Sequence, residues 1–501
     1  MNRLRFDFGK RTVRVILAAL VCCVLVAALV APLPANACST FMLQHESELL
    51  YGHNLNEGDI GVPGMVFVNK RGVFKEGRTL SELTTKDGVE PSTLRWISRF
   101  GSVTFNNFGK DLPDGGMNEV GLYIWEMNEE ADYPTDDELP RLMHANWMQF
   151  VLDNYASLDD AINSTNEIVL DGWTWHYFLG DADGNTATLA FIDGEVVVHR
   201  GESMPVPGLF NTPYDREMEI LRYFEGFGGE YEPDLDDSNV PRFVKTAVMT
   251  RDYDPAMDAV EYGLMMLDQL KVSDVPEWSI LIDVRRRDVY FKTRINPSIK
   301  RFSMNDIDFS NRGPTLVLDL DFESADRGTE LEMFPNGVGF DVSDRLHPMS
   351  YEDVRGLVTA VTEMPGIPQE FFTGGGLTVA EFIDRFAGHY LRAQGTVGQL
   401  AGTWETPEED ATDTRKLRLV LTTHGVAVSG SISNWKNPQV SSPIEHIDMI
   451  GPKLTFTYRL RKDGRIMRAE AQVDGDEMTL MLFGTEDFYG EYVLERSDSP
   501  R

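Results

Sequence analysis

A single cysteine, Cys38, directly follows the tripeptide Ala35-Asn36-Ala37, and this position could supply it with its own base. If the peptide bond before Cys38 is cut, the new α-amine has an ordinary pKa of about 7.7–8.0. A neutral amine of this kind can accept the proton of the neighbouring thiol, directly or through one water. The thiol itself ionises at about pH 8.5, so it needs little activation. The pattern predicts an N-terminal nucleophile that needs no distant histidine.

The first 37 residues have the composition of a secretory signal peptide. Basic residues of the first 14 positions precede an unbroken apolar run, Val15–Ala31, and an Ala-x-Ala cleavage site ends at Ala37. We therefore expect export, and a periplasmic or extracellular mature protein with no stable membrane span. An uncleaved anchor is the alternative, because 17 apolar residues almost reach the length of a membrane-spanning helix.

Cleavage after Ala37 would leave Cys38 as the only cysteine of the mature chain. Cys22 and Cys23, the other two cysteines, lie inside the apolar run. One cysteine cannot form an internal disulfide, and an idle thiol is prone to oxidation outside the cytoplasm. A nucleophile is the favoured interpretation. A lipidated cysteine is the second, although the sequence lacks the leucine usual three residues before it, and an incidental cysteine is the third.

Composition and motifs exclude several other classes of function. The 501-residue chain has 80 acidic and 46 basic side chains and a net charge of −34, which disfavours binding to nucleic acid. The nine histidines form no cluster, there is no His-Glu-x-x-His motif, and no phosphate-binding loop occurs. We expect neither a metal nor another cofactor.

Five segments in order follow a recognisable pattern. The mature start, Cys38-Ser-Thr-Phe-Met-Leu, precedes a charged turn and a second apolar strand that ends in Gly52-His53-Asn54-Leu55-Asn56. A hairpin would return the end of that strand to Cys38. The later segments are Met117-Asn118-Glu119-Val120-Gly121-Leu122 with Asn128 beyond it, Trp175–Asp181 with Asp183-Gly184, Phe210-Asn211-Thr212-Pro213-Tyr214, and Pro241-Arg242-Phe243-Val244-Lys245.

Together these segments resemble the choloylglycine hydrolase and penicillin V acylase family, the linear amide hydrolases with an N-terminal nucleophile. The resemblance covers roughly residues 38–325 and implies hydrolysis of a small-molecule amide. It implies that Cys38 is the nucleophile, that Asn211 and Asn128 hold the oxyanion, and that Arg242 supports the active-site network. For Asn211, Asn128 and Arg242, the alternative is an ordinary role in a turn or at the surface. Asn118 is expected to shape a turn with Gly121.

The chain departs from the family pattern at three positions. His53 stands where the family has an Arg that supports the thiolate, and Asn56 stands where the family has an Asp that holds the terminal amine. His53 could be protonated or neutral, and Asn56 could still accept a hydrogen bond. Asp59 is a candidate for the missing carboxylate, and Lys245 replaces the final Arg of its motif. These changes leave the substrate undetermined among bile-salt conjugates, penicillin V, acyl homoserine lactones and other amides.

Length and patterning predict several parts. Residues 1–37 are the signal peptide, and 38–325 are the catalytic domain, with the α+β, four-layer αββα core that the resemblance implies. Residues 326–400 read as a helical linker. In residues 401–501, apolar and polar residues alternate as they do in short strands. This pattern predicts a small all-β barrel or sandwich, loosely lipocalin-like. The rival to an amide hydrolase is a non-catalytic exported or lipid-anchored protein that binds ligand through this β-domain. Whether the protein forms a homo-oligomer stays open.

Overall fold

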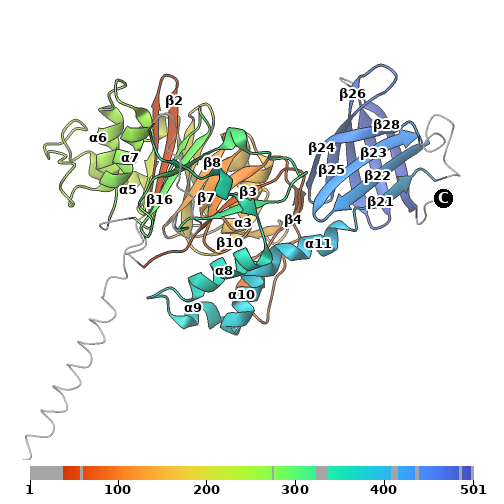
Figure 1. Ribbon diagram of the computed structural model, residues 1–501, viewed down its shortest axis with the longest axis horizontal. Helices are drawn as coiled ribbons and strands as arrows, with labels where there is room; N and C mark the ends of the chain where they lie inside the picture. The colour runs from red at the N-terminus through yellow and green to blue at the C-terminus, as the bar shows by residue number, and fades with distance from the viewer. Residues whose placement is uncertain are drawn as a thin grey trace, which may run out of the picture. The chain divides into compact units, whose positions relative to one another are not determined.

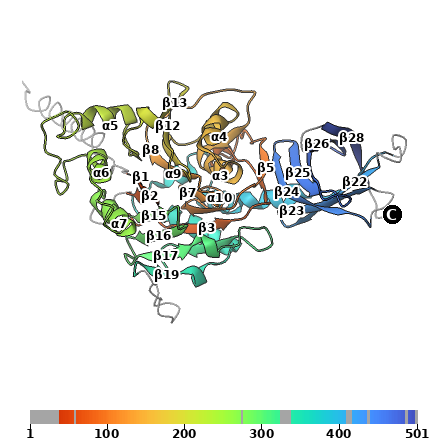
Figure 2. The same cartoon turned by 90° about the horizontal axis from the view of Figure 1, so that it is seen from above.

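The computed structural model describes residues 38–56, 60–272, 276–322, 337–407, 416–434, 439–484 and 488–497. The predicted signal peptide and Asp59 lie outside these residues. Within them, no helix has the length and hydrophobicity needed to cross a membrane. Two large β-sheets with helices beside them form most of the chain up to Pro348, and a β-barrel follows near the C-terminal end (Figures 1 and 2).

The first sheet carries Cys38 just before one of its strands. Among the described residues its order is β14-β1-β2-β15-β16-β17-β19. The strands are β14 (Gly208–Leu209), β1 (Ser39–His45), β2 (Glu48–Leu55), β15 (Trp278–Asp283), β16 (Asp288–Thr293), β17 (Lys300–Ser303) and β19 (Phe340–Asp341). Cys38 therefore begins a strand that is paired on both sides.

The second sheet faces the first. Its order in the described part of the chain is β13-β12-β11-β8-β7-β6-β3-β18-β20. The strands are β13 (Glu195–Arg200), β12 (Thr186–Ile192), β11 (Trp175–Gly180), β8 (Tyr123–Asn128), β7 (Gly115–Asn118), β6 (Ser102–Asn106), β3 (Met65–Asn69), β18 (Leu316–Asp319) and β20 (His347–Pro348). Rings join the sheets, since Tyr51 of β2 stacks on Tyr123 of β8 with centroids 4.6 Å apart.

The predicted hairpin after Cys38 is confirmed. β1 and β2 are antiparallel, with His45 opposite Glu48 at the turn and Ser39 opposite Asn54 at the other end. Opposite residues of an antiparallel pair point to the same face, and neighbours along a strand point to opposite faces. Cys38 and Thr40 therefore face the second sheet, while Ser39 faces the helices behind the first.

Helices pack against both sheets. α6 (Arg242–Arg251) and α7 (Ala259–Gln269) contact strands of the first sheet, and α3 (His144–Asn154) contacts the second. The sequence has helical apolar spacing over Leu139–Asn154 and over Val244–Leu270, and the helices in these ranges are shorter than that spacing predicts.

The reason differs between the two helical ranges. In the first, β9 (Arg141–Met143) is a strand that pairs in parallel with β10 (Val169–Asp171). In the second, the segment that contains Pro255 ends the first helix, since proline disfavours helix both at its own position and before it. Asp258 then starts α7 by accepting a hydrogen bond from the backbone of Glu261.

The range predicted as a helical linker contains strands as well as helices. β19 and β20 belong to the two large sheets. The helices that follow are α8 (Tyr351–Thr362), α9 (Gln369–Thr373), α10 (Val379–Gly388) and α11 (Arg392–Val397). This region therefore completes both sheets before it becomes helical.

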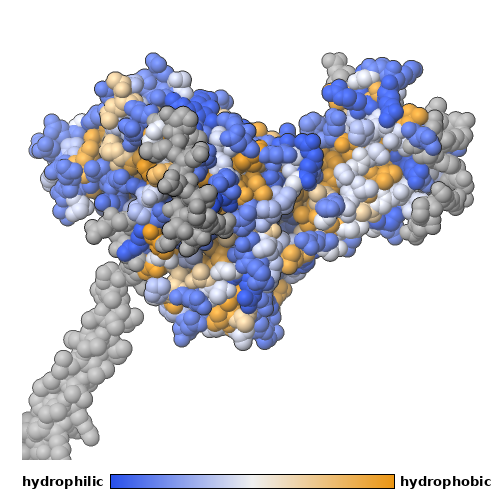
Figure 3. Space-filling model, in the orientation of Figure 1, coloured by the Kyte–Doolittle hydropathy of each residue, from blue (hydrophilic) through white to orange (hydrophobic). Residues whose placement is uncertain are grey.

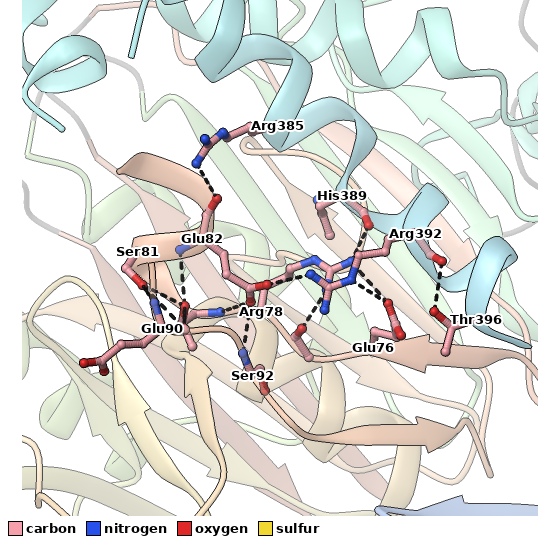
Figure 4. Close-up of polar contacts among 12 residues, drawn as sticks. Glu76, Arg78, Ser81, Glu82, Glu90, Ser92, Arg385, His389, Arg392 and Thr396 are labelled. Carbon is pink, nitrogen blue, oxygen red and sulfur yellow. Dashed lines mark hydrogen bonds and ion pairs between the residues drawn. The ribbon is translucent and has the colours of Figure 1, made fainter. Parts of the chain in front are cut away.

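Ion pairs and hydrogen bonds hold the helical region against the core (Figure 4). Arg392 of α11 contacts Glu76 at 2.9 Å and Glu82 at 2.7 Å. Arg78 donates to the backbone oxygen of His389 at 2.6 Å, and Arg385 donates to that of Glu82 at 2.9 Å. Each guanidinium bonds a carboxylate or carbonyl of the other part, as fixed docking of the helices requires.

The C-terminal strands form a closed barrel, so the barrel is the correct choice of the two predicted forms. Its strands are β21 (Gly402–Glu405), β22 (Leu417–His424), β23 (Ala427–Asn434), β24 (Ser442–Ile450), β25 (Lys453–Arg459), β26 (Ile466–Asp474), β27 (Glu477–Phe483) and β28 (Phe488–Ser497). They pair in the order β23-β22-β21-β28-β27-β26-β25-β24, and β23 also pairs with β24 to close the ring. Alternate apolar residues such as Leu419, Leu421 and Phe456 are buried, which fits the filled interior of a small barrel.

Buried hydrophobic residues of the described chain form three clusters. One lies between the two sheets and under α6 and α7, the second lies between the second sheet and α3, α8 and α10, and the third fills the barrel. The face drawn in Figure 3 is largely hydrophilic, with its hydrophobic residues scattered in small groups. Most apolar side chains of the described residues therefore lie in the interior.

Candidate active site

Cys38 is fully buried at the entry to β1. Thr40 is opposite His53 of β2 on one side and opposite Leu209 of β14 on the other. β14 ends at Leu209, two residues before Asn211, and the chain bends at Asn211. The strand pairing therefore brings the segment that leads to Asn211 beside the strand that follows Cys38.

Arg242 supplies a positive charge beside Cys38. It is the first residue of α6, and its Nη1 donates to the Cys38 backbone oxygen at 2.7 Å and to Ser39 Oγ at 2.6 Å. Burial lowers the pKa of Arg242 to about 10, against the opposite influence of Cys38 and Glu217. The guanidinium stays protonated at neutral pH, so it fixes the Cys38 backbone and favours a thiolate there.

The two asparagines expected to bind an oxyanion lie together. Asn211 Nδ2 donates to the backbone oxygen of Asn128 at 3.0 Å. The side-chain oxygen of Asn128 accepts from the Trp175 indole at 2.8 Å, which leaves its amide nitrogen as the free end of the group. The Asn211 side chain has a second N–H as well. Both residues therefore can present amide donors near the nucleophile.

His53 does not provide the cation that the resemblance implies at its position. Its Nδ1 is 2.7 Å from Thr40 Oγ1, and its ring stacks on Trp125 with centroids 4.1 Å apart. Complete burial holds the pKa of His53 well below its usual range. Of the two charge states that the sequence allows, the structure selects neutral imidazole, and Arg242 is the cation at Cys38.

Asn56 follows the last residue of β2 and is 2% exposed. The neighbouring segment 57–59 lies outside the described residues, so the interpretation of Asp59 as a replacement carboxylate stays a prediction. Of the sequence-predicted residues, Arg242 is hydrogen-bonded to Cys38 and Asn211 is hydrogen-bonded to Asn128. His53 lies between the two sheets, beside Thr40, which is two positions along the chain from Cys38.

Asn118 and Lys245 have structural roles. Asn118 accepts from the backbone of Leu122 at 2.9 Å and donates to the backbone oxygen of Tyr155 at 2.8 Å, as its predicted turn role requires. Gly121 in that turn has φ +94°, which only glycine adopts without strain. Lys245 donates to the backbone oxygen of Leu235 at 2.6 Å.

Sequence reasoning missed Glu217, a carboxylate of α5 (Tyr214–Leu221) that is 6% exposed. Burial raises its pKa to about 7, while Arg242 and a hydrogen bond with Thr212 act in the opposite direction. The available signal was its position in the helix that follows the Asn211 segment. An acid that titrates near neutrality next to Arg242 can tune the charge felt by Cys38.

We expect Glu217→Gln to change the pH dependence of Cys38 alkylation. Because the raised pKa keeps Glu217 neutral below about pH 7, the variant and the wild type should react equally there. Above pH 7 the ionised carboxylate partly neutralises Arg242, so the variant should react roughly 3- to 10-fold faster, up to about one pKa unit of interaction. Iodoacetamide rates from pH 5 to 9 on the mature protein measure this.

Glu219→Gln is the matched control for that experiment. Glu219 lies on the same helix but is exposed and pairs with Arg216 at 2.7 Å. Its variant should follow the wild-type profile throughout. Equal rates for Glu217→Gln and wild type above pH 8 would show that Glu217 does not act on the thiol.

Comparison with known proteins supports the relationship that these residues suggest. No protein-family model matches the chain. A penicillin V acylase from Pectobacterium atrosepticum is 25% identical over 281 residues, which cover 46% of this chain and 73% of the relative.

Two solved structures are similar to the larger part of the chain. The penicillin V acylase of Agrobacterium tumefaciens is 23% identical, with a TM-score of 0.49, and covers 62% of this chain and 98% of its own. A conjugated bile acid hydrolase from Clostridium perfringens is 14% identical, with a TM-score of 0.45, and covers 57% and 97%. By its sequence match and the order of its motifs, the chain is similar to the choloylglycine hydrolase and penicillin V acylase family of linear amide hydrolases.

Proposed function

We propose that the mature protein is an exported acylase that hydrolyses the C–N bond of a small linear amide, with Cys38 as its nucleophile. The observation that carries the proposal is the position of Cys38. It is buried at the start of β1 and bonded to Arg242 through its backbone. The similarity to penicillin V acylases supports the reaction class, and these contacts support the assignment of the nucleophile.

The chemistry follows from the groups at hand. The α-amine of Cys38 takes the thiol proton, and the thiolate attacks the carbonyl carbon of the amide. Asn211 and Asn128 donate hydrogen bonds to the resulting oxyanion. When the C–N bond breaks, the ammonium group returns its proton to the departing amine. Water, deprotonated by the same α-amine, then attacks the thioester to release the acid and restore the thiol.

Export and activation would be a single event in this scheme. Before cleavage after Ala37, the nitrogen of Cys38 belongs to a peptide bond and cannot act as a base. Removal of the predicted signal peptide, residues 1–37, creates the amine. We infer that the two facing sheets and the helices against them form the αββα arrangement that places this amine next to the substrate.

The mass of the purified mature protein and its turnover of an acyl-amide panel, measured on one preparation, test the proposal. We expect a chain that begins at unmodified Cys38 and that releases amine from at least one amide. A diacylglycerol thioether on Cys38 would block the thiol and would favour the lipid-anchored binding protein. A correctly processed chain without turnover of any amide would contradict the enzyme assignment.

A further inference from the structure

A cavity of about 520 Å³ lies beside the two asparagines of the candidate site. The loop after β8, the strands β11 to β14 and the start of α5 provide its walls. Glu129 on its edge directly follows Asn128, and Pro213 is two residues after Asn211. The cavity has the size of a small-molecule site.

The cavity and the Cys38 thiol lie on the same face of the first sheet. Leu209, part of the cavity wall, is opposite Thr40, so both side chains point to the second sheet. Cys38 is two positions before Thr40 and shares this face. On the other wall, His176 Nε2 is 2.6 Å from the backbone oxygen of Phe210, the residue before Asn211. A substrate whose carbonyl lies at Cys38 could therefore extend past the neighbouring strand β14 into the cavity.

The ionisable side chains that line this cavity within the described chain are predominantly acidic. They are five carboxylates and two histidines, without lysine or arginine. The carboxylates are Glu129, Glu130, Asp132, Asp193 and Asp215. Asp215 lies 3.7 Å from His199, one of the two histidines. Burial and the neighbouring Glu130 raise the pKa of Glu129, as expected for like charges without a cation between them.

The acidity of the whole chain does not account for this lining. The chain has 46 basic side chains for its 80 acidic ones, and exposed carboxylates elsewhere on it pair with arginine, as Asp159 does with Arg200. Apolar residues such as Leu209, Phe191 and Val197 form the remaining wall. An apolar wall with an acidic rim suits an organic cation and repels an anion.

We propose that this cavity makes the enzyme selective for amides that carry a positively charged group. The inference rests on the proposed function and names its substrate class, a cationic linear amide. The acidic rim binds the charge, the apolar wall contacts the carbon skeleton next to it, and the scissile carbonyl lies at Cys38. An amide with a carboxylate or sulfonate in the same place is a poor substrate.

A matched set of amides tests this selectivity on the mature protein. Each member has one scaffold and ends in trimethylammonium, in its neutral isostere tert-butyl, or in carboxylate. One series places this group on the acyl part and the other places it on the amine part, which identifies the part that enters the cavity. At low ionic strength kcat/KM should fall by about tenfold or more from cation to neutral isostere, and again to the anion. Added salt should shrink both ratios.

The variant Glu129→Gln/Asp132→Asn/Asp193→Asn removes three charges of the rim. Its cation-to-neutral ratio should fall towards one, while turnover of the neutral isostere shows that the variant is folded and active. Glu195→Gln is the control, because Glu195 is exposed on β13 but does not line the cavity. It should keep the wild-type ratio.

The outcomes separate the two proposals. Turnover of the neutral amide with a cation-to-neutral ratio near one would overturn the selectivity inference and leave the acylase assignment standing. An unchanged ratio in the triple variant would also overturn it. If correctly processed protein turns over no member of either series, the proposed function fails instead.

Discussion

Replacement of Cys38 by Ser should abolish amide hydrolysis while the protein stays folded. Serine is nearly the size of cysteine, so the buried site at the start of β1 can accept it. Its hydroxyl is far less acidic than a thiol, and the α-amine is too weak a base to activate it well. We expect kcat to fall by roughly 10⁴-fold or more, in the range found when a nucleophile is removed from other hydrolases.

Three measurements on the same Cys38→Ser preparation make the result interpretable. Turnover of the best amide gives kcat, iodoacetamide labelling followed by intact mass gives the thiol count, and thermal unfolding reports the fold. Since Cys38 is the only cysteine after position 37, labelling should disappear together with turnover. Turnover within tenfold of wild type in a fully processed variant would refute Cys38 as the nucleophile.

Asn211→Ala should lower kcat by about 10²- to 10³-fold, the usual cost of one oxyanion donor. The variant loses the side-chain amide that donates to the backbone oxygen of Asn128 at 3.0 Å. Because the donor acts on charge that develops during the reaction, KM should change much less than kcat. Steady-state kinetics with the best amide of the panel measure both.

Alkylation of Cys38 distinguishes this role from a structural one. Iodoacetamide reacts with the thiolate without forming an oxyanion, so Asn211→Ala should label at close to the wild-type rate. Asn239→Ala is the control, since Asn239 is exposed and donates hydrogen bonds to Asp237. A parallel loss of labelling and turnover would mean that Asn211 shapes the site and does not bind the oxyanion.

Local patterns predicted the parts of the fold that depend on neighbours in the chain. The hairpin from Cys38 to Asn56 follows from alternating apolar residues around a polar turn, and the β-rich end was read in the same way. Helix ends were less accessible. Apolar spacing over Leu139–Asn154 continues through Arg141–Met143, but pairing with the distant Val169–Asp171 makes that piece a strand. Tertiary hydrogen bonds override local propensity there.

The candidate site likewise has features that the sequence predicted and features that only the structure shows. Its nucleophile and its oxyanion candidates could be found because they stand in ordered motifs. The charge state of His53 could not, since it depends on complete burial against Trp125. Glu217 belongs to no motif, and its raised pKa comes from the packing of α5 near Arg242.

The sequence by itself predicted a cleavage site before Cys38, and it determined that Cys38 is the only cysteine after position 37 and that family-like motifs follow in order. These features depend only on the order and number of residues, so the sequence shows them without any knowledge of the fold. The tertiary structure decided that Arg242 is the cation at Cys38 and that His53 is neutral. It also decided that five carboxylates from separate segments line one cavity. Charge and pKa depend on distances across the fold, and strand pairing sets those distances.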